Sequence, residues 1–201
     1  MSKLPFSFYQ NKEVNQLAVQ LLGKQLYTFI EGELTGGLIV ETEAYNGVED
    51  KASHAYGGRF TDRTKIMYEE GGVSYVYLCY GIHHLFNVVT APKGTPHAVL
   101  IRGLEPITGI KVMLRRRNMS VLKPNITAGP GALAKAMGID KKLNAKDLCG
   151  DEIWIEDKKL VFKNDDIVAV PRVGVDYAGD HALLPWRYYI KGNRFVSKPN
   201  S

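Results

Sequence analysis

The chain has 201 residues, and 26 Lys and Arg against 21 Asp and Glu give it a formal net charge of +5. Its apolar fraction of 45% is enough for a core, and its length suits a single domain over residues 1–201. Cys79 and Cys149 are too few for a disulfide framework and lack a metal-type spacing. No apolar signal region or bilayer-spanning run is present. We therefore expect a cytoplasmic protein, and its basic balance favours an anionic partner.

The first part of the chain predicts an amphipathic helix followed by a hairpin. Apolar residues recur with the helical period over residues 12–22, where Asn11 can cap the start and Gly23 the end. Residues 25–30 have strand composition, and a glycine-containing connection leads into a second strand over residues 36–45. The two strands predict an antiparallel hairpin with an irregular turn.

The second strand of this hairpin carries two carboxylates. Because side chains alternate along a strand, Glu41, Glu43 and Tyr45 share one face with Ile39. Carboxylates on a mostly apolar strand are costly unless a site uses them, although a solvated face would explain either one alone. The aromatic ring two residues after Glu43, and the polar loop that ends in His54, favour a site.

Residues 46–72 predict a long, glycine-punctuated loop with one short helix near residues 64–69. Long irregular segments in a compact domain are usually functional or disordered. The basic and aromatic side chains that accompany His54 in this loop are Arg59, Arg63, Lys65 and Tyr56. Their mixture favours a binding loop.

An aromatic strand is predicted next, over residues 74–80, followed by a strand over residues 84–90. In a regular strand Tyr77 and Tyr80 cannot point the same way, because three positions separate them. Asn87 lies inside the second strand, where asparagine is disfavoured. We therefore expect Asn87 to have a specific role.

The second half of the chain predicts one longer strand, two helices and several short strands. The strand covers residues 97–104, and the first helix, residues 107–118, has a basic outer face that includes Arg115, for which solvation is the ordinary explanation. The second helix, residues 129–137, begins Gly-Pro-Gly, so free N–H groups near Gly131 can face an anion. The short strands are predicted at residues 152–156, 160–163, 167–172 and 186–190.

These elements predict an α+β fold, in which helices and one long functional loop surround a curved, mostly antiparallel sheet. The five histidines form no zinc-hydrolase motif, so we expect no metal, and the chain lacks a serine nucleophile elbow and a phosphate-binding loop. A carboxylate in an aromatic pocket is a suitable general base for water, and aromatic rings bind flat ligands. Together with the positive charge, these features favour hydrolysis at a nucleobase.

Several longer motifs stand in order along nearly the whole chain, from about Phe8 to Ser197. They are Val40-Glu-Thr-Glu-Ala-Tyr45, Glu49-Asp50 through His54, Tyr75-Val-Tyr77 with Tyr80-Gly81, Asn87, Val99-Leu-Ile-Arg-Gly-Leu-Glu-Pro106, Gly129-Pro-Gly, Pro171-Arg-Val-Gly-Val and Pro185-Trp-Arg-Tyr-Tyr-Ile-Lys-Gly. In this order they resemble the alkyladenine (3-methyladenine) DNA glycosylase family. The sequence differs from the family pattern at Ile82-His83, where the best-known members have Met-Tyr. It also differs at Ala132, where a phosphate-contacting lysine is common.

The resemblance implies a monofunctional glycosylase that flips an alkylated or deaminated purine out of duplex DNA and hydrolyses its N-glycosidic bond. It implies that Glu43 is the general base that activates water and that Tyr80 is the wedge that fills the gap in the duplex. The residues expected to bind the substrate are Tyr45, His54, Tyr77, Asn87 and Arg102. We expect further DNA contacts at Arg115 and Gly131.

The implied partner is double-stranded DNA with damaged purines, bound by a monomer without a cofactor and without a membrane, at the nucleoid if the source is bacterial. The lesion preference stays open among 3-methyladenine, 7-methylguanine, hypoxanthine and ethenoadenine. Two other classes also stay open, a non-catalytic nucleic-acid-binding module and a purine nucleoside hydrolase. Retention of Glu43 argues against the first, and the basic charge and Tyr80 argue against the second.

Overall fold

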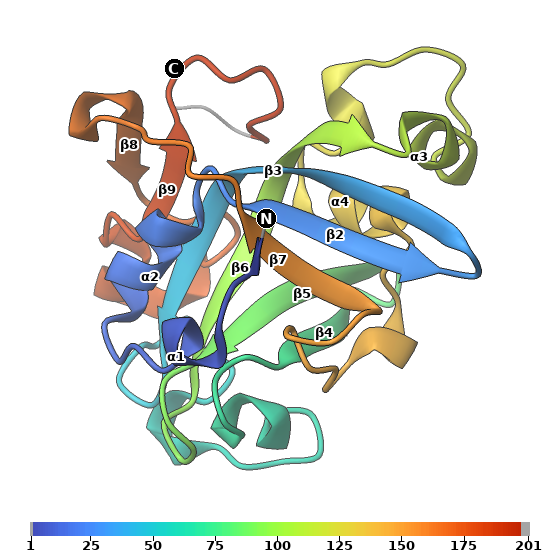
Figure 1. Ribbon diagram of the computed structural model, residues 1–201. Helices are drawn as coiled ribbons and strands as arrows, with labels where there is room; N and C mark the ends of the chain where they lie inside the picture. The colour runs from blue at the N-terminus through green and yellow to red at the C-terminus, as the bar shows by residue number, and fades with distance from the viewer. Residues whose placement is uncertain (1, 198–201) are drawn as a thin grey trace.

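The computed structural model describes residues 2–197, and Figure 1 shows their arrangement. Its strands are β1 (Ser2–Lys3), β2 (Gln25–Ile30), β3 (Glu33–Asn46), β4 (Ser74–Cys79), β5 (His83–Thr90), β6 (His97–Thr108), β7 (Ile153–Asp157), β8 (Ile167–Val170) and β9 (Arg187–Ile190). They form one antiparallel sheet in the order β1-β7-β2-β3-β6-β5-β4, while β9 pairs with β3 and β8 pairs with β9.

The helices flank this sheet. They are α1 (Phe6–Tyr9), α2 (Val14–Leu21), α3 (Ile110–Arg116) and α4 (Pro130–Met137), with 3-10 turns η1 (Tyr56–Gly58), η2 (Lys65–Tyr68), η3 (Pro124–Ile126), η4 (Lys141–Leu143), η5 (Asn164–Asp166) and η6 (Asp176–Leu183). Helix α2 packs on β3 and β6, whereas α4 packs on β5 and β6 and is joined by α3. In Figure 1, α2 lies to the left of β6, and α3 and α4 lie to its right.

Strand β3 organises the sheet because three other strands pair with it. Its first part pairs with β2 and its later part with β9, while β6 runs along its other edge. The pairing with β6 shifts register beside Gly36 and on both sides of Glu41. Such bulges bend a strand and increase its twist. The bends let one 14-residue strand belong to a strongly curved sheet.

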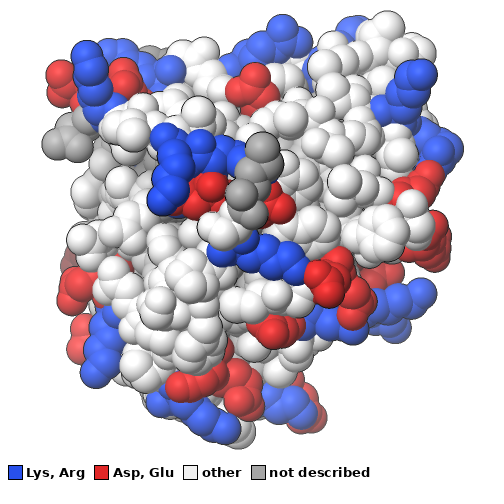
Figure 2. All heavy atoms as spheres, viewed as in Figure 1, with Lys and Arg blue, Asp and Glu red and all other residues white. Residues whose placement is uncertain are grey.

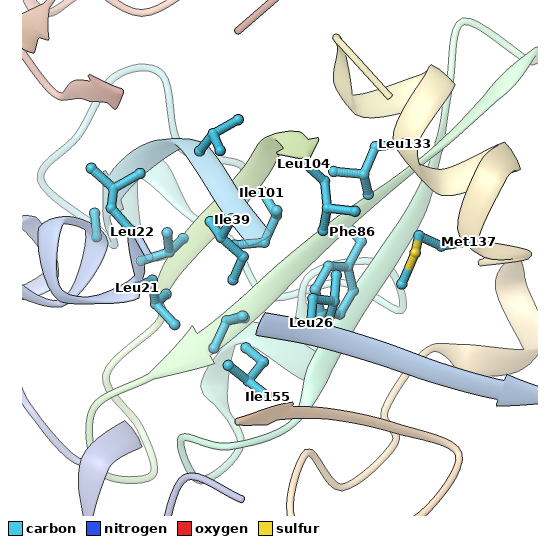
Figure 3. Packing of buried hydrophobic residues seen from close by; sticks show 14 of the residues in the cluster. Leu21, Leu22, Leu26, Ile39, Phe86, Ile101, Leu104, Leu133, Met137 and Ile155 are labelled. Carbon is cyan, nitrogen blue, oxygen red and sulfur yellow. The ribbon is translucent and has the colours of Figure 1, made fainter. Parts of the chain in front are cut away.

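The main core lies between the helices and the sheet (Figure 3). Figure 3 shows Leu21 of α2 and the next residue, Leu22, near Ile39. It also shows Leu133 and Met137 of α4 near Phe86 of β5 and Leu104 of β6. A separate cluster contains Met67 of η2, Tyr75 of β4, and Val89 and Ala98 of neighbouring strands. This second cluster fastens the loop of residues 46–72 to the sheet.

The α+β fold with its curved antiparallel sheet and surrounding helices is confirmed, but some predicted elements are wrong. The helix predicted over residues 107–118 is shorter, because it covers only Ile110–Arg116. Residues 160–163 are not a strand, because the chain turns at Lys159, whose φ is 59°, and then lacks a pairing partner. Strand β8 ends at Val170. Strand β6 continues through Pro106 to Thr108, because the register shift beside Gly36 tolerates a residue without an N–H.

Charged side chains of both signs are interspersed on the face seen in Figure 2. Several cations are paired with acids, among them Lys3 with Asp151 and Lys24 with Asp157. The positive side chains on this face are therefore interspersed with acidic ones and do not form one continuous patch. Within the described residues, no helix is both long enough and apolar enough to cross a membrane.

Candidate active site

A cavity of about 450 Å³ opens beside the long loop, which is within the usual range for ligand sites. Its wall combines residues of β3, β4, β5 and β6 with the loop of residues 46–72 and with residues 173–177. The structure brings most of the predicted site residues to this wall, and these are Tyr45, His54, Tyr77, Tyr80, Asn87 and Arg102. Segments far apart in the chain therefore converge on one pocket.

Glu43 lies directly behind this wall and is completely buried. Its Oε2 accepts a hydrogen bond from the Tyr45 hydroxyl at 2.8 Å, and its Oε1 accepts one from the Val173 N–H at 2.8 Å. The Nε of Arg102 is 3.4 Å from Oε1. Tyr45, Val173 and Arg102 all line the cavity. The carboxylate is thus held in one orientation at the edge of the pocket.

The hydroxyl of Tyr45 remains a donor because burial, and then the nearby Glu43, raise its pKa well above the usual value. Register explains why the two side chains meet. Glu43 pairs with Leu100 and Tyr45 with Ala98 in a regular stretch of the β3–β6 ladder, so they point to the same side. The shared face predicted from alternation is confirmed for Glu43 and Tyr45. It does not extend to Ile39, which lies in the main core beyond the register shifts at Glu41.

The other buried carboxylate of β3, Glu41, pairs with two arginines instead. Its Oε1 accepts from the Nε of Arg102 at 3.2 Å and from the Nε of Arg187 at 2.9 Å, and Ser197 donates to it as well. Burial lowers the pKa of Arg102, but the charges of Glu43 and Glu41 outweigh it, so the pKa is raised overall. Glu41 is therefore a structural counterion, which leaves Glu43 as the carboxylate at the cavity.

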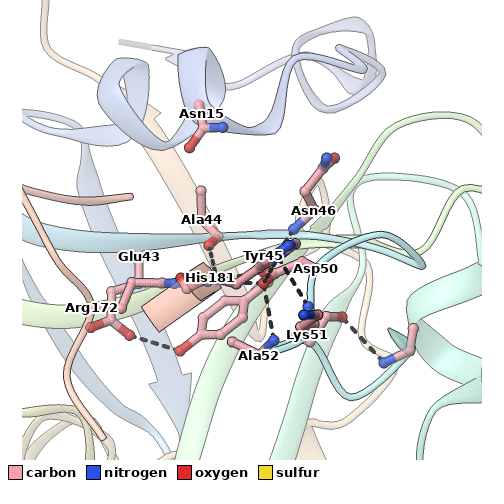
Figure 4. Close-up of polar contacts among 12 residues, drawn as sticks. Asn15, Glu43, Ala44, Tyr45, Asn46, Asp50, Lys51, Ala52, Arg172 and His181 are labelled. Carbon is pink, nitrogen blue, oxygen red and sulfur yellow. Dashed lines mark hydrogen bonds and ion pairs between the residues drawn. The ribbon is translucent and has the colours of Figure 1, made fainter. Parts of the chain in front are cut away.

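Arg172 and Asp50 form a buried ion pair next to Tyr45 (Figure 4), which no motif in the sequence predicts. The guanidinium of Arg172 donates to both Asp50 oxygens and, at 2.9 Å, to the carbonyl oxygen of Ala44. Its central carbon is 4.8 Å from the centroid of the Tyr45 ring. Asp50 also accepts from the N–H of Ala52 at 3.0 Å. The pair therefore fastens the long loop to β3 and supports one wall of the cavity.

A local signal for Asp50 was present in the sequence, because aspartate commonly accepts from the N–H two residues on. Arg172 belongs to the motif Pro171-Arg-Val-Gly-Val, but the sequence predicted no role for it. Two further wall residues also lacked one, namely Val173 and Tyr177, whose hydroxyl donates to the Ala52 carbonyl at 3.1 Å. The contacts that Arg172, Val173 and Tyr177 make with β3 and with the long loop join residues more than 120 positions apart, so no local sequence pattern predicts them.

Another part of the cavity wall contains His54, Tyr75 and Tyr77. The rings of His54 and Tyr77 meet edge to face, with centroids 4.7 Å apart. The His54 Nδ1 is 2.9 Å from the Tyr75 hydroxyl, and its Nε2 is 3.2 Å from Nη2 of Arg63. Since a guanidinium can only donate, Nε2 must accept from Arg63. The proton of neutral His54 is therefore on Nδ1 and is donated to Tyr75.

The pKa of His54 falls from 6.5 to about 4, because of burial and then because of Arg63 and Arg59. The unfolded chain binds a proton near pH 6.5, where folded His54 remains neutral. The free energy of unfolding that comes from keeping His54 neutral is complete above pH 6.5 and is lost as the pH falls toward 4.

His54→Gln should remove this part of the pH dependence of the free energy of unfolding. Urea unfolding from pH 4 to pH 7.5 measures it, with His83→Gln, at an exposed histidine, as the control. An unchanged slope in His54→Gln would contradict the assignment.

Asn87 is almost completely buried in β5, at 3% exposure, and lines the cavity. Its Nδ2 donates to the carbonyl oxygen of Tyr75 at 3.1 Å. The ladder places Asn87 opposite Tyr75 on one side and Leu100 on the other. The amide is thus held rigidly in the floor of the cavity, although its predicted contact with a purine stays a prediction.

Tyr80 lies at the tip of the β4–β5 hairpin and is 89% exposed at the mouth of the cavity. Strand β4 ends at Cys79, whose carbonyl oxygen accepts from the N–H of Ile82 at 3.1 Å. Tyr80 and Gly81 have φ of 49° and 71°, as in a type I′ turn. The turn, and not strand alternation, therefore separates the directions of Tyr77 and Tyr80. A tyrosine in this conformation costs about 1–2 kcal/mol, and such strain is common at functional sites.

The two remaining DNA-contact residues differ in position. Arg115 is exposed on α3 and pairs with Glu33, at the start of β3, which is on the order of 30 Å along the strand from Glu43. The structure does not bring Arg115 to the cavity. Gly131 lies in the first turn of α4, where a Cβ would come within 2.8 Å of the His83 ring, next to the Tyr80 turn. Both DNA contacts stay predictions.

Comparison with known proteins identifies the family of the chain. Residues 7–194 match the family described as "Methylpurine-DNA glycosylase". A Bacillus cereus (strain G9842) protein named "Putative 3-methyladenine DNA glycosylase" is 46% identical over 205 residues, covering 96% of this chain and 98% of that protein. A protein of the same name from strain B4264 is 45% identical over 202 residues, with the same coverage.

These matches define the class of the protein, which is that of the DNA glycosylases, hydrolases that act in DNA repair. The chain belongs to the methylpurine-DNA glycosylase family. The resemblance carried by the sequence motifs is thereby confirmed.

Proposed function

We propose that the protein binds double-stranded DNA as a monomer, flips a damaged purine into the cavity and hydrolyses its N-glycosidic bond, leaving an abasic site. The observation that carries this proposal is the position of Glu43, which is buried at the cavity edge and is held by Tyr45 and Val173. A carboxylate fixed in this way can orient a water molecule and take its proton as the water attacks the sugar carbon.

The walls suit a flat, unstacked base. Tyr45, backed by the Arg172–Asp50 pair, would lie along one side of the purine, and His54 with Tyr77 along the other. Base–aromatic stacking contributes about 1–3 kcal/mol per base, which offsets part of the cost of unstacking. Tyr80, held outward by its turn, would occupy the space that the flipped nucleotide leaves in the duplex.

A panel of duplexes with single lesions tests the proposal. Each duplex carries 3-methyladenine, 7-methylguanine, hypoxanthine or ethenoadenine, and the free base is measured after incubation with the protein. Release of at least one damaged base, together with an alkali-sensitive abasic site, is the expected result. No release from any duplex would overturn the proposal and favour a non-catalytic binding module.

A salt titration separates this function from hydrolysis of free nucleosides. Duplex affinity should fall steeply as salt increases, because bound phosphates release counterions. An affinity that does not depend on salt, combined with hydrolysis of free purine nucleosides, would favour the nucleoside hydrolase.

Asn87 provides a test of base discrimination. Its rigid amide in the cavity floor would collide with the exocyclic amine of guanine, so we expect Asn87→Ser to increase the release of normal guanine from undamaged duplex by about tenfold, the size of one lost steric contact. Base release from undamaged and hypoxanthine-containing duplexes measures this effect. Unchanged guanine release would remove Asn87 from this role.

A further inference from the structure

Arg63 reaches the cavity from the long loop and lies on one of the aromatic walls. Its guanidinium carbon is 4.8 Å from the centroid of the Tyr77 ring. Its Nη2 donates to Nε2 of His54 at 3.2 Å. Arg63 is also among the residues that line the cavity. A cationic side chain of the protein therefore already covers part of the Tyr77 ring, on which a base would stack.

Arg63 differs from the other arginines around the cavity in its charge environment. Arg102 and Arg187 pair with Glu41, and Arg172 pairs with Asp50. Among the residues that the structure describes, no carboxylate lies within ion-pairing distance of Arg63. Its positive charge at the cavity is thus not neutralised by a partner.

The neighbours of Arg63 keep it in this position. His54 is neutral at physiological pH, since burial and Arg63 lower its pKa to about 4, and its Nε2 can then accept from the guanidinium. The hydrogen bond from Nδ1 to Tyr75 orients the imidazole for this contact. The guanidinium of Arg63 is therefore held by Nε2 of His54 and by the face of the Tyr77 ring, and both contacts are present at neutral pH.

We propose that Arg63 is a specificity-determining residue that favours neutral purines with hydrogen-bond acceptors over purines that carry a positive charge. This inference rests on the proposed function, because it concerns which flipped bases the same cavity accepts. The acceptors in question are purine ring nitrogens and the exocyclic oxygen of an oxopurine.

The physical reason is competition for one ring and repulsion between like charges. A cationic base would gain cation–π attraction from Tyr77, but the guanidinium already has that contact and must be displaced from it. A neutral purine meets no charge repulsion and can accept a hydrogen bond from the guanidinium. Because Arg63 is exposed, solvent screens its charge, so we expect a fivefold to tenfold effect on discrimination, on the order of one cation–π contact.

Single-turnover base release with saturating protein tests this inference. Two duplexes are compared, one with 7-methylguanine, which is cationic, and one with hypoxanthine, which is neutral. The ratio of the two rates is expected to rise about fivefold to tenfold in Arg63→Gln and in Arg63→Met, and to stay near the wild-type value in Arg63→Lys. Lys65→Gln is the matched control, because it removes a charge that pairs with Asp62 in the same loop.

A second measurement needs no variant. In the wild-type protein the same ratio should rise as salt increases, since salt screens the repulsion between Arg63 and a cationic base. A ratio that is unchanged in both neutral variants, or rates that fall equally for both lesions, would overturn the inference. The proposed function itself fails only if the wild-type protein releases no base from any of the four lesion duplexes. Release of 3-methyladenine without release of hypoxanthine would overturn the inference alone, because the cavity would then favour a cationic base.

Discussion

Glu43→Gln is expected to lower single-turnover base release by about 100-fold to 10,000-fold, the range typical of a lost general base. Glutamine has the shape of glutamate but cannot take a proton from water. The variant should still bind a duplex that contains an abasic-site mimic, with an affinity within a few-fold of the wild type. Base release and duplex affinity, measured on the same preparation, separate chemistry from binding.

Some loss of stability is also expected in this variant. The glutamine amide would bring N–H donors toward the Val173 N–H or the Tyr45 hydroxyl, both of which donate to Glu43 in the wild type. A buried donor without an acceptor costs about 1–3 kcal/mol. Assays well below the midpoint of thermal unfolding therefore keep the variant folded.

Glu41→Gln is the matched control, because Glu41 is equally buried, lies two residues away and also contacts Arg102. We expect it to destabilise the fold through Arg102 and Arg187, yet to reduce base release of the folded protein much less than Glu43→Gln does. Undiminished release by Glu43→Gln, or an equal loss in both variants, would remove the general-base role from Glu43.

Arg172→Met is expected to reduce the free energy of unfolding by about 3–5 kcal/mol, because it leaves a buried carboxylate without its partner. The side chains of Arg172 and Asp50 are both completely buried. For a chain of this length, such a loss lowers the melting temperature by about 6–20 °C. Urea unfolding and thermal unfolding followed by circular dichroism measure the change.

A double-mutant cycle shows whether the pair itself is responsible. Arg172→Met combined with Asp50→Asn should cost much less than the sum of the two single changes, because neither charge is then left buried alone. Arg115→Met is the control, since it breaks the exposed pair with Glu33 and should cost less than about 1 kcal/mol. A similar small loss for Arg172→Met would show that the buried pair does not stabilise the loop.

Local periodicity was sufficient where neighbouring residues decide the structure. The shared face of Glu43 and Tyr45 follows from alternation, because the β3–β6 ladder is regular at these positions. The helical period likewise placed α2 and α4. The strand predicted at residues 160–163 is absent, because their strand-like composition is not matched by a partner strand in the sheet. Tyr80 shows the same limit, because a turn sets its direction.

Sequence alone established the chemical groups, the α+β composition and the family motifs, because these depend on residue types and short spacings. Tertiary structure decided which of two carboxylates is hydrogen-bonded to the cavity wall, since Tyr45 and Val173 donate to Glu43, whereas Glu41 pairs with Arg102 and Arg187. It also decided that Arg172 meets Asp50, 122 residues away, and that Arg63 lies on Tyr77. Such contacts arise only when the curved sheet brings distant segments together, and no local pattern encodes them.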